Sequence, residues 1–124
     1  MYEIKELHLH ERHREGVLTR QQTSTMLFGM GPSLRYSPEE PVRIFVGKEP
    51  LAEGVIRSVM VFQVSQVIDM VIQKKGGRTR NVVMDALNRH YKDAAGRDIK
   101  QKDSMTFLEW EYVRNAETGE HGIH

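Results

Sequence analysis

The spacing of apolar residues in the first third of the chain alternates between strand and helix periods. Residues 2–9 alternate, imperfectly, between apolar and polar side chains and so predict a strand. Residues 10–19 predict a short helix, although Gly16 costs about 1 kcal/mol in a helix interior. Residues 23–29 are rich in β-branched and apolar side chains, which indicates a second strand, and the glycines and proline of residues 29–33 predict a loop.

The middle of the chain has a clear strand period followed by a long valine-rich stretch. A third strand is expected over residues 41–48, because alternate positions place three aliphatic side chains on one face: Val42, Ile44 and Val46. Residues 51–72 are too rich in valine to favour a helix. We expect two strand segments there that meet around Ser58, with Gly54 at the turn that opens them.

The last third of the chain predicts a basic loop, a helix and a strand. Residues 74–80, KKGGRTR, predict the loop, and residues 81–91 carry a helical stripe that consists of Val83, Ala86, Leu87 and His90. On this pattern His90 is expected in the core, Asn81 is the expected N-cap and Gly96 ends the region. Residues 104–113 alternate as a strand.

The order of these elements predicts the fold class. Short, mostly antiparallel strands with two helices favour an α+β fold in which a small sheet curls into a β-barrel that the helices plug or flank. We expect a single domain over residues 1–113 and a flexible tail over residues 114–124, which has little apolar content.

Composition narrows the class of protein. The chain has no cysteine, which excludes a disulfide framework, a thiol nucleophile and cysteine-ligated zinc. No apolar stretch approaches the roughly 20 residues that span a bilayer, and the first residues do not form a signal peptide, so we expect a cytoplasmic protein. The 18 Lys and Arg residues exceed the 17 Asp and Glu residues by one, so net charge alone does not indicate a nucleic-acid partner.

Local charge is more informative than net charge. Between Asp69 and Asp85 the only charged residues are four cations: Lys74, Lys75, Arg78 and Arg80. Between Glu15 and Glu39 the only charged residues are Arg20 and Arg35. These acid-free segments either contact phosphate groups, with strong salt dependence, or form ordinary solvated surface.

A histidine cluster near the N-terminus raises the question of a metal. Three imidazoles, from His8, His10 and His13, could hold zinc with an open position for water. Their spacing crosses the predicted junction between strand and helix, and charged residues surround them. We therefore expect exposed histidines, and predict neither a metal nor a cofactor.

Residues 17–27, VLTRQQTSTML, resemble a segment of the ASCH domain, a relative of the PUA RNA-binding fold. The ASCH segment can be written I-L-x-G-x-K-T-x-T-x-R, and the two match without a gap in the aliphatic pair and both threonines. Residues 54–67 resemble the central strand pair of that family, and residues 85–93 and 104–113 resemble its closing helix and strand. The resemblance covers most of residues 2–113 and implies an ASCH-like barrel.

The departures from the ASCH pattern affect its chemistry. This chain has Arg20 where the pattern has Gly, Gln22 where it has Lys, and Leu27 where it has Arg. Some ASCH proteins use that lysine, the second threonine and a separate glutamate to hydrolyse an acylated cytidine. A glutamine amide is neither basic nor nucleophilic, so this resemblance implies recognition more than hydrolysis.

The sequence therefore predicts an RNA- or nucleotide-binding domain, monomeric or weakly dimeric, whose ligand lies between the first helix and the barrel. In this hypothesis Arg20 and the 74–80 loop position phosphate, whereas Gln22, Thr23 and Thr25 contact the base or ribose. The alternative for Gln22, Thr23 and Thr25 is that they form a solvated turn and the outer face of a strand, with no ligand.

Two other classes of function stay open. One is a hydrolase of a modified nucleoside or a ribonuclease, for which the candidate side chains are His8, His13, His90, Arg20 and Arg80. The other is a protein-interaction module that uses an exposed apolar stripe on the second strand, formed by Met26, Phe28 and Met30.

Overall fold

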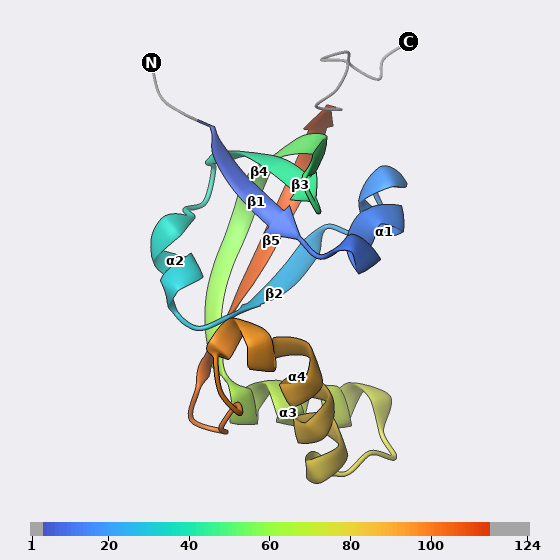
Figure 1. Cartoon of the computed structure of the whole chain (residues 1–124), viewed down its shortest axis with the longest axis vertical. Helices are drawn as coiled ribbons and strands as arrows, with labels where there is room; N and C mark the ends of the chain where they lie inside the picture. Colours follow the sequence, from blue (N-terminus) through green and yellow to red (C-terminus); the bar gives the residue numbers. More distant parts are fainter. Residues whose placement is uncertain (1–3, 115–124) are drawn as a thin grey trace. The chain divides into compact units, whose positions relative to one another are not determined.

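The computed structural model describes residues 4–114 and divides them between two compact units. The sheet unit comprises the chain up to Thr25, Tyr36–Val59 and the chain from Leu108 on, and the helical unit comprises Met26–Arg35 and Met60–Phe107. The elements in chain order are β1 (Lys5–Leu9), the 3-10 helix η1 (Glu11–His13), α1 (Arg14–Leu18), β2 (Ser24–Phe28), α2 (Gly31–Arg35), β3 (Pro41–Val46), β4 (Glu49–Gln63), α3 (Val64–Lys75), α4 (Arg80–Ala95) and β5 (Ser104–Arg114) (Figure 1).

Two expectations concern the ends of the chain. The single domain expected over residues 1–113 stays a prediction. The tail expected over residues 114–124 lies outside the described residues, except for Arg114, as do residues 2 and 3 of the first predicted strand.

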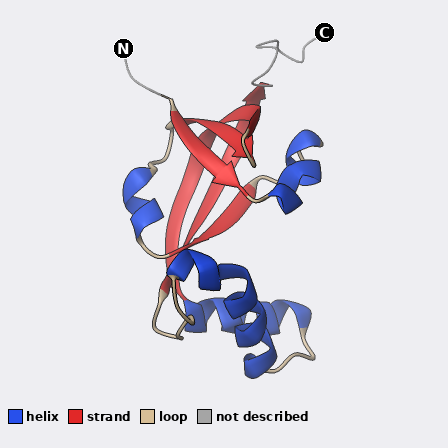
Figure 2. Cartoon of the chain, viewed as in Figure 1, coloured by secondary structure: helices blue, strands red, loops and turns tan. Residues whose placement is uncertain are grey.

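The five strands form one mixed sheet (Figure 2), and their order in it is β1-β3-β4-β5-β2. β1 pairs with β3 in parallel and β3 pairs with β4 in antiparallel orientation. β2 is antiparallel to β5, because Trp110 N donates to Thr23 O at 2.9 Å whereas Gly29 N donates to Ser104 O at 2.7 Å. The predicted α+β fold is confirmed, as a half-barrel that is open between β1 and β2 over the described residues.

Alternation along β3 places its aliphatic side chains in the core of the sheet unit, as predicted. Val42, Ile44 and Val46 are at most 1% exposed. Their neighbours on β1 are the buried Leu7 and Leu9, of which Leu7 lies opposite Ile44. The period of two in the sequence was therefore sufficient to locate this strand and its buried face.

Gly54 lies inside β4, so the turn expected at this residue is wrong. β4 is a single strand of 15 residues that continues through Ser58 without the expected break. A Cβ atom at Gly54 would lie 2.7 Å from the backbone oxygen of Glu111. The glycine permits a close approach of two backbones, which is the other common reason for glycine within a strand.

The expectation of strand over residues 64–72 is wrong, because this segment forms α3. Val64, Val67 and Ile68 are at most 3% exposed, at the spacing of one helical face, and they belong to the core of the helical unit. Valine loses less than about 0.7 kcal/mol per residue in a helix, whereas burying its side chain contributes about 1.5–3 kcal/mol. A capping box between Gln63 and Gln66 fixes where the helix begins.

The predicted second helix is present as α4 and begins earlier than expected. Thr79 is the N-cap, because its hydroxyl accepts a hydrogen bond from Val82 N at 3.3 Å, so the N-cap assigned to Asn81 is wrong. The helix ends, as predicted, at Gly96, whose φ of 75° is left-handed. α3 and α4 lie side by side in the helical unit (Figure 1).

The remaining helices are short. The first predicted helix is present as η1 followed by α1, and His10 caps it through its Nδ1. The loop expected over residues 29–33 contains the beginning of α2, with Pro32 buried in its first turn. None of the helices in residues 4–114 combines the length and the apolar character needed to cross a membrane.

Candidate nucleic-acid-binding residues

The turn between α1 and β2 holds Arg20 in a strained conformation. Arg20 has a φ of +63°, in the left-handed region, which costs a non-glycine residue about 1–2 kcal/mol. Its backbone N–H and its Nη1 both donate to the Val17 carbonyl, and its guanidinium lies 5.0 Å from the centre of the Tyr112 ring. These contacts compensate the strain and fix the position of the cation.

Gln22 uses both ends of its amide within the sheet unit. Its Nε2 donates to Ser24 O at 3.0 Å, which leaves Oε1 to accept from His13 Nδ1 at 3.0 Å. Its backbone N–H donates to Gly16 O at 3.0 Å, and its backbone oxygen accepts from the Tyr112 hydroxyl. Gln22 therefore ties α1, β2 and β5 together.

Burial shifts the pKa values of the two titratable partners of Gln22, which are His13 and Tyr112. Burial lowers the pKa of His13 below its usual value near 6.5, which favours a neutral ring. Because Gln22 Oε1 is an acceptor, the proton of that ring is on Nδ1. Burial raises the pKa of the Tyr112 hydroxyl, which keeps it protonated and able to donate to Gln22.

Thr23 and Thr25 differ from Gln22 because their hydroxyls have no hydrogen-bond partner among residues 4–114. Thr23 is exposed and Thr25 is half-buried. Only the backbone of Thr23 is engaged, by Trp110 N. Both hydroxyls are thus chemically available to a ligand.

The loop predicted over residues 74–80 is too long, because Lys74 and Lys75 are the last residues of α3 and Arg80 is the first residue of α4, so that only residues 76–79 join the two helices. We keep the name 74–80 loop for the whole basic segment, which belongs to the helical unit. The side chains of Lys74, Lys75 and Arg78 are exposed, and within the described part of the chain they have no ion-pair partner. Two glycines with φ of 66° and 64° lie between them. Arg80 differs from these three cations: it is the first residue of α4 and pairs with Asp69 and, at 3.2 Å, with Gln101 Oε1.

The eight predicted residues therefore form two groups. The first group is in the sheet unit and consists of Arg20, Gln22, Thr23 and Thr25, and the second is in the helical unit and consists of Lys74, Lys75, Arg78 and Arg80. Of the eight predicted residues, only Lys75 and Arg78 line one of three pockets in the described part of the chain. The cleft expected between the first helix and the barrel stays a prediction.

The N-terminal histidines have different partners. His8 contacts Glu6 Oε1 at 3.0 Å and stacks on the Phe45 ring at 4.6 Å, whereas His10 Nδ1 accepts from Arg12 N at 3.1 Å. His13, as described above, bonds to Gln22. Across residues 4–114 no group of three or more His, Asp or Glu side chains is arranged to hold a metal ion.

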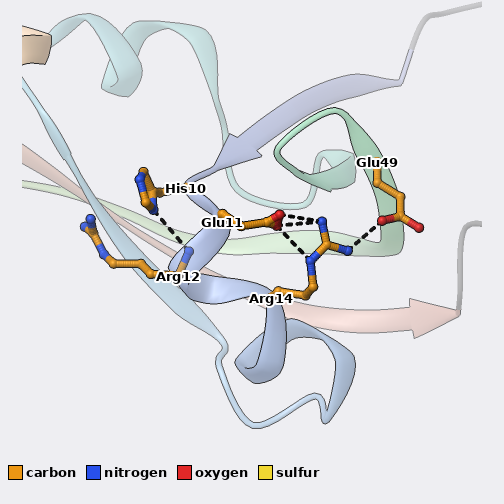
Figure 3. Close-up of polar contacts among 5 residues, drawn as sticks. All are labelled: His10, Glu11, Arg12, Arg14 and Glu49. Carbon is orange, nitrogen blue, oxygen red and sulfur yellow. Dashed lines mark hydrogen bonds and ion pairs between the residues drawn. The ribbon is translucent and has the colours of Figure 1, made fainter.

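Arg14 neutralises two carboxylates next to these histidines. Figure 3 shows its guanidinium between Glu11 and Glu49. Nε and Nη2 donate to Glu11 at 2.7 Å, and Nη1 donates to Glu49 at 2.6 Å, so the hydrogen bonds to Glu11 and Glu49 raise the pKa of Arg14. Two acids against one cation make this surface a poor site for phosphate.

Two expectations about exposure are wrong. His90 is exposed rather than in the core, because the buried stripe of α4 runs through Val83 and Leu87 with Tyr91 partly buried beside them. Met26 and Phe28 pack against the core of the helical unit, and only Met30, which is 54% exposed, remains of the proposed interaction stripe.

Sequence reasoning missed an apolar groove between α3 and α4. Val71 and Val82 contribute to its lining, together with the cations Lys75 and Arg78. The helical period of residues 64, 67, 68, 71 and 72 was the available signal. The strand prediction for that segment concealed it.

Neither any protein-family model nor any curated protein sequence matches the chain. Its structure is similar to protein EF3133 from Enterococcus faecalis V583, of the family DUF984, with a TM-score of 0.61 and 16% identity over 92% of this chain and 78% of that chain. It is similar to an ASCH domain from Lactobacillus crispatus JV V101, with a TM-score of 0.51 and 11% identity over 79% of this chain and 68% of that chain. It is also similar to hypothetical protein PH0355, with a TM-score of 0.56 and 11% identity over 90% of this chain and 100% of that chain. The fold is therefore ASCH-like, and the correspondence of residues 17–27 to the ASCH motif stays a prediction.

Proposed function

We propose that this protein binds RNA or a nucleotide-like ligand through two groups of polar residues. The cations of the 74–80 loop contact phosphate. Arg20 adds a further phosphate contact, while Thr23 and Thr25 contact the base or ribose. The ASCH-like fold supports this proposal, because the ASCH domain is related to an RNA-binding fold.

The observation that carries the proposal is that three neighbouring cations of the 74–80 loop have no ion-pair partner among the described residues. Four arginines elsewhere in the described chain are held in ion pairs with carboxylates: Arg14, Arg43, Arg57 and Arg97. Other exposed cations also lack an ion-pair partner among residues 4–114, for example Arg12 and Arg89, so what distinguishes the loop is that its unpaired cations are clustered. Lys74, Lys75 and Arg78 have no such partner and no acid between them in the sequence. Exposed cations that lack internal partners are suited to an external anion such as a phosphate backbone.

Gln22 has a positioning role in this proposal. The oxygen and the nitrogen of its side-chain amide already bond to His13 and to Ser24, and a ligand contact would require one of those bonds to be exchanged. The neighbouring hydroxyls of Thr23 and Thr25 need no such exchange. We therefore assign direct contact to the threonines, with Gln22 holding the segment that presents them.

The expected salt dependence follows from the number of available cations. Lys74, Lys75, Arg78 and Arg20 make four phosphate contacts, which on a single strand give a slope of about −2.8 in a plot of log affinity against log salt concentration, at about 0.7 per contact. Affinity then falls about 50-fold between 50 and 200 mM salt. Arg80 adds less, because Asp69 competes with phosphate for it.

Fluorescence anisotropy titrations of labelled single-stranded RNA at these two salt concentrations test the proposal. Substituting Lys74→Gln with Lys75→Gln is expected to weaken binding and to reduce the salt slope by about 1.4. The control is Lys100→Gln with Lys102→Gln, which removes the same charge from exposed lysines of the same unit. Binding that is insensitive to salt, or equal losses in both double variants, would overturn the proposed role of the loop.

The threonine group is tested separately. The double substitution Thr23→Val and Thr25→Val removes both hydroxyls and preserves side-chain shape and strand propensity. We expect weaker RNA binding with an unchanged salt slope, because no charge is removed. Unchanged affinity would remove these residues from the site and leave the phosphate contacts intact.

A further inference from the structure

The groove between α3 and α4 has a volume of about 200 Å³ and a mostly aliphatic lining. Five aliphatic residues contribute to it: Val71, Val82, Val83, Ala86 and Leu87. Val83 and Leu87 are 5% and 8% exposed and form its floor as part of the core. Val82 is 49% exposed at its side, so apolar surface continues from the core to solvent.

Cations surround the mouth of this groove. Lys75, at the end of α3, and Arg78, in the loop, line it and have no ion-pair partner among the described residues, and His90 adds an exposed imidazole. No acidic residue of the described chain lines the groove. Asp69 pairs with Arg80.

The acids of α4 flank the groove without lining it. Asp85 lies about 100° around the helix from Ala86 and on the side opposite to Leu87. Asp93 lies almost one turn beyond His90, at the far end of the helix. The mouth therefore has a net positive charge next to an apolar interior.

We propose that this groove binds one unstacked base of single-stranded RNA, with the adjoining phosphates on Lys75 and Arg78. The inference rests on the proposed function and adds the class of RNA and the place of a base. A nucleotide combines a flat ring, which has apolar faces and polar edges, with a neighbouring negative charge. The faces of the ring match the apolar interior, and the phosphate matches the cationic mouth. A base within a duplex is paired and stacked, so it is unable to enter.

The size of the groove favours a single ring over a peptide helix. A protein cavity of about 150 Å³ accommodates a benzene molecule, so about 200 Å³ is enough for one ring system. Helix-in-groove recognition uses anchors at positions such as i, i+4 and i+7, which need a longer apolar channel. The apolar lining from α4 extends from Val82 to Leu87, about 8 Å along the helix axis.

The decisive experiment compares two single-stranded oligomers of equal length by anisotropy. One carries bases and the other is an abasic ribose-phosphate chain, so both present the same phosphates. We expect the wild-type protein to bind the base-bearing oligomer about 5- to 10-fold more tightly, which is the low end of the range found for stacking one base on an aromatic side chain, because this lining is mostly aliphatic. The same base-bearing strand within a duplex is expected to bind more weakly than the free strand.

A matched pair of variants locates the preference. Ala86→Leu fills the groove from a half-buried position, whereas Ala94→Leu adds the same group at an exposed position of the same helix. We expect Ala86→Leu to abolish the preference for bases and Ala94→Leu to retain it, with thermal melting as a check that both fold. If Ala86→Leu keeps the preference, or if the wild type binds both oligomers equally, the base site is overturned while phosphate binding stands. If the groove binds an acidic peptide rather than a base, Ala86→Leu is expected to leave the relative affinity for the two oligomers unchanged, which is one of these overturning results. Absence of RNA binding to the wild type would overturn both proposals.

Discussion

Gly16 is the position at which packing reverses the ordinary effect of a glycine-to-alanine substitution. In an unstrained helix this change stabilises a protein by about 0.5–1 kcal/mol. At Gly16, in α1, the new Cβ atom would lie 2.8 Å from Gln22 Cβ and 2.9 Å from Gln22 Oε1. Overpacking of this kind typically costs about 1–3 kcal/mol. The net expectation is a loss of about 0.5–2 kcal/mol in the free energy of unfolding.

Urea denaturation followed by the fluorescence of Trp110, the only tryptophan, measures this loss. With a urea m-value of about 1.5–2 kcal/mol/M, the midpoint should fall by about 0.3–1 M. The control is Gly31→Ala in α2, where the nearest atom to a new Cβ is Arg35 Nη1 at an ordinary 3.7 Å. Because Pro32 follows and disfavours the helical conformation for an alanine at position 31, this control should unfold at or slightly below the wild-type midpoint, with a smaller loss than Gly16→Ala. A midpoint for Gly16→Ala at or above that of the wild type would refute the packing role assigned to Gln22.

Three further outcomes are expected. Tyr112→Phe leaves the Gln22 carbonyl without its hydroxyl donor and should lower the free energy of unfolding, measured in urea, by about 1–2 kcal/mol. Because burial raises the pKa of Tyr112, the stability of the wild type should also decline above about pH 10, and this variant should lack that decline. The hydrogen bonds from Arg97 lower the pKa of Asp103 to about 2, so this carboxylate stabilises the fold above about pH 4 and its contribution is lost as the pH falls towards 2. In Asp103→Asn the melting temperature should therefore change less between pH 4 and pH 2 than in the wild type. The same pH dependence in both proteins would contradict the assignment. Thr79→Ala removes the N-cap of α4 and should cost about 1 kcal/mol, whereas the neighbouring Asn81→Ala should cost little; the reverse order would return the cap to Asn81.

The sequence was informative where a side-chain period and its burial agree. Val42, Ile44 and Val46 repeat every two residues, and this repeat alone locates β3 and its buried face. Gly96 ends α4 as expected, since a left-handed residue is needed there. The exposed cations of the 74–80 loop were also predictable, because an acid-free stretch with two glycines offers few internal partners.

The sequence failed where tertiary contacts override local preference. Residues 64–72 favour a strand by composition, yet packing one helical face against α4 outweighs that preference. The hydrogen-bond partners of Gln22, His13 and Tyr112, were not predictable, because they lie 9 and 90 residues away along the chain and no local pattern indicates them. Likewise the ion pair between Arg80 and Asp69 spans 11 residues and removes one cation from a segment that looked uniformly available.

The close approach at Gly54 limits how this chain can evolve. Every other amino acid has a Cβ atom, and that atom would meet the backbone oxygen of Glu111 rather than a side chain able to rotate away. Every substitution of Gly54 is therefore expected to destabilise the fold. In a saturation-mutagenesis library selected for folded protein, this strand position is expected to keep only its original residue, while exposed positions of β4 such as Arg57 and Met60 accept many.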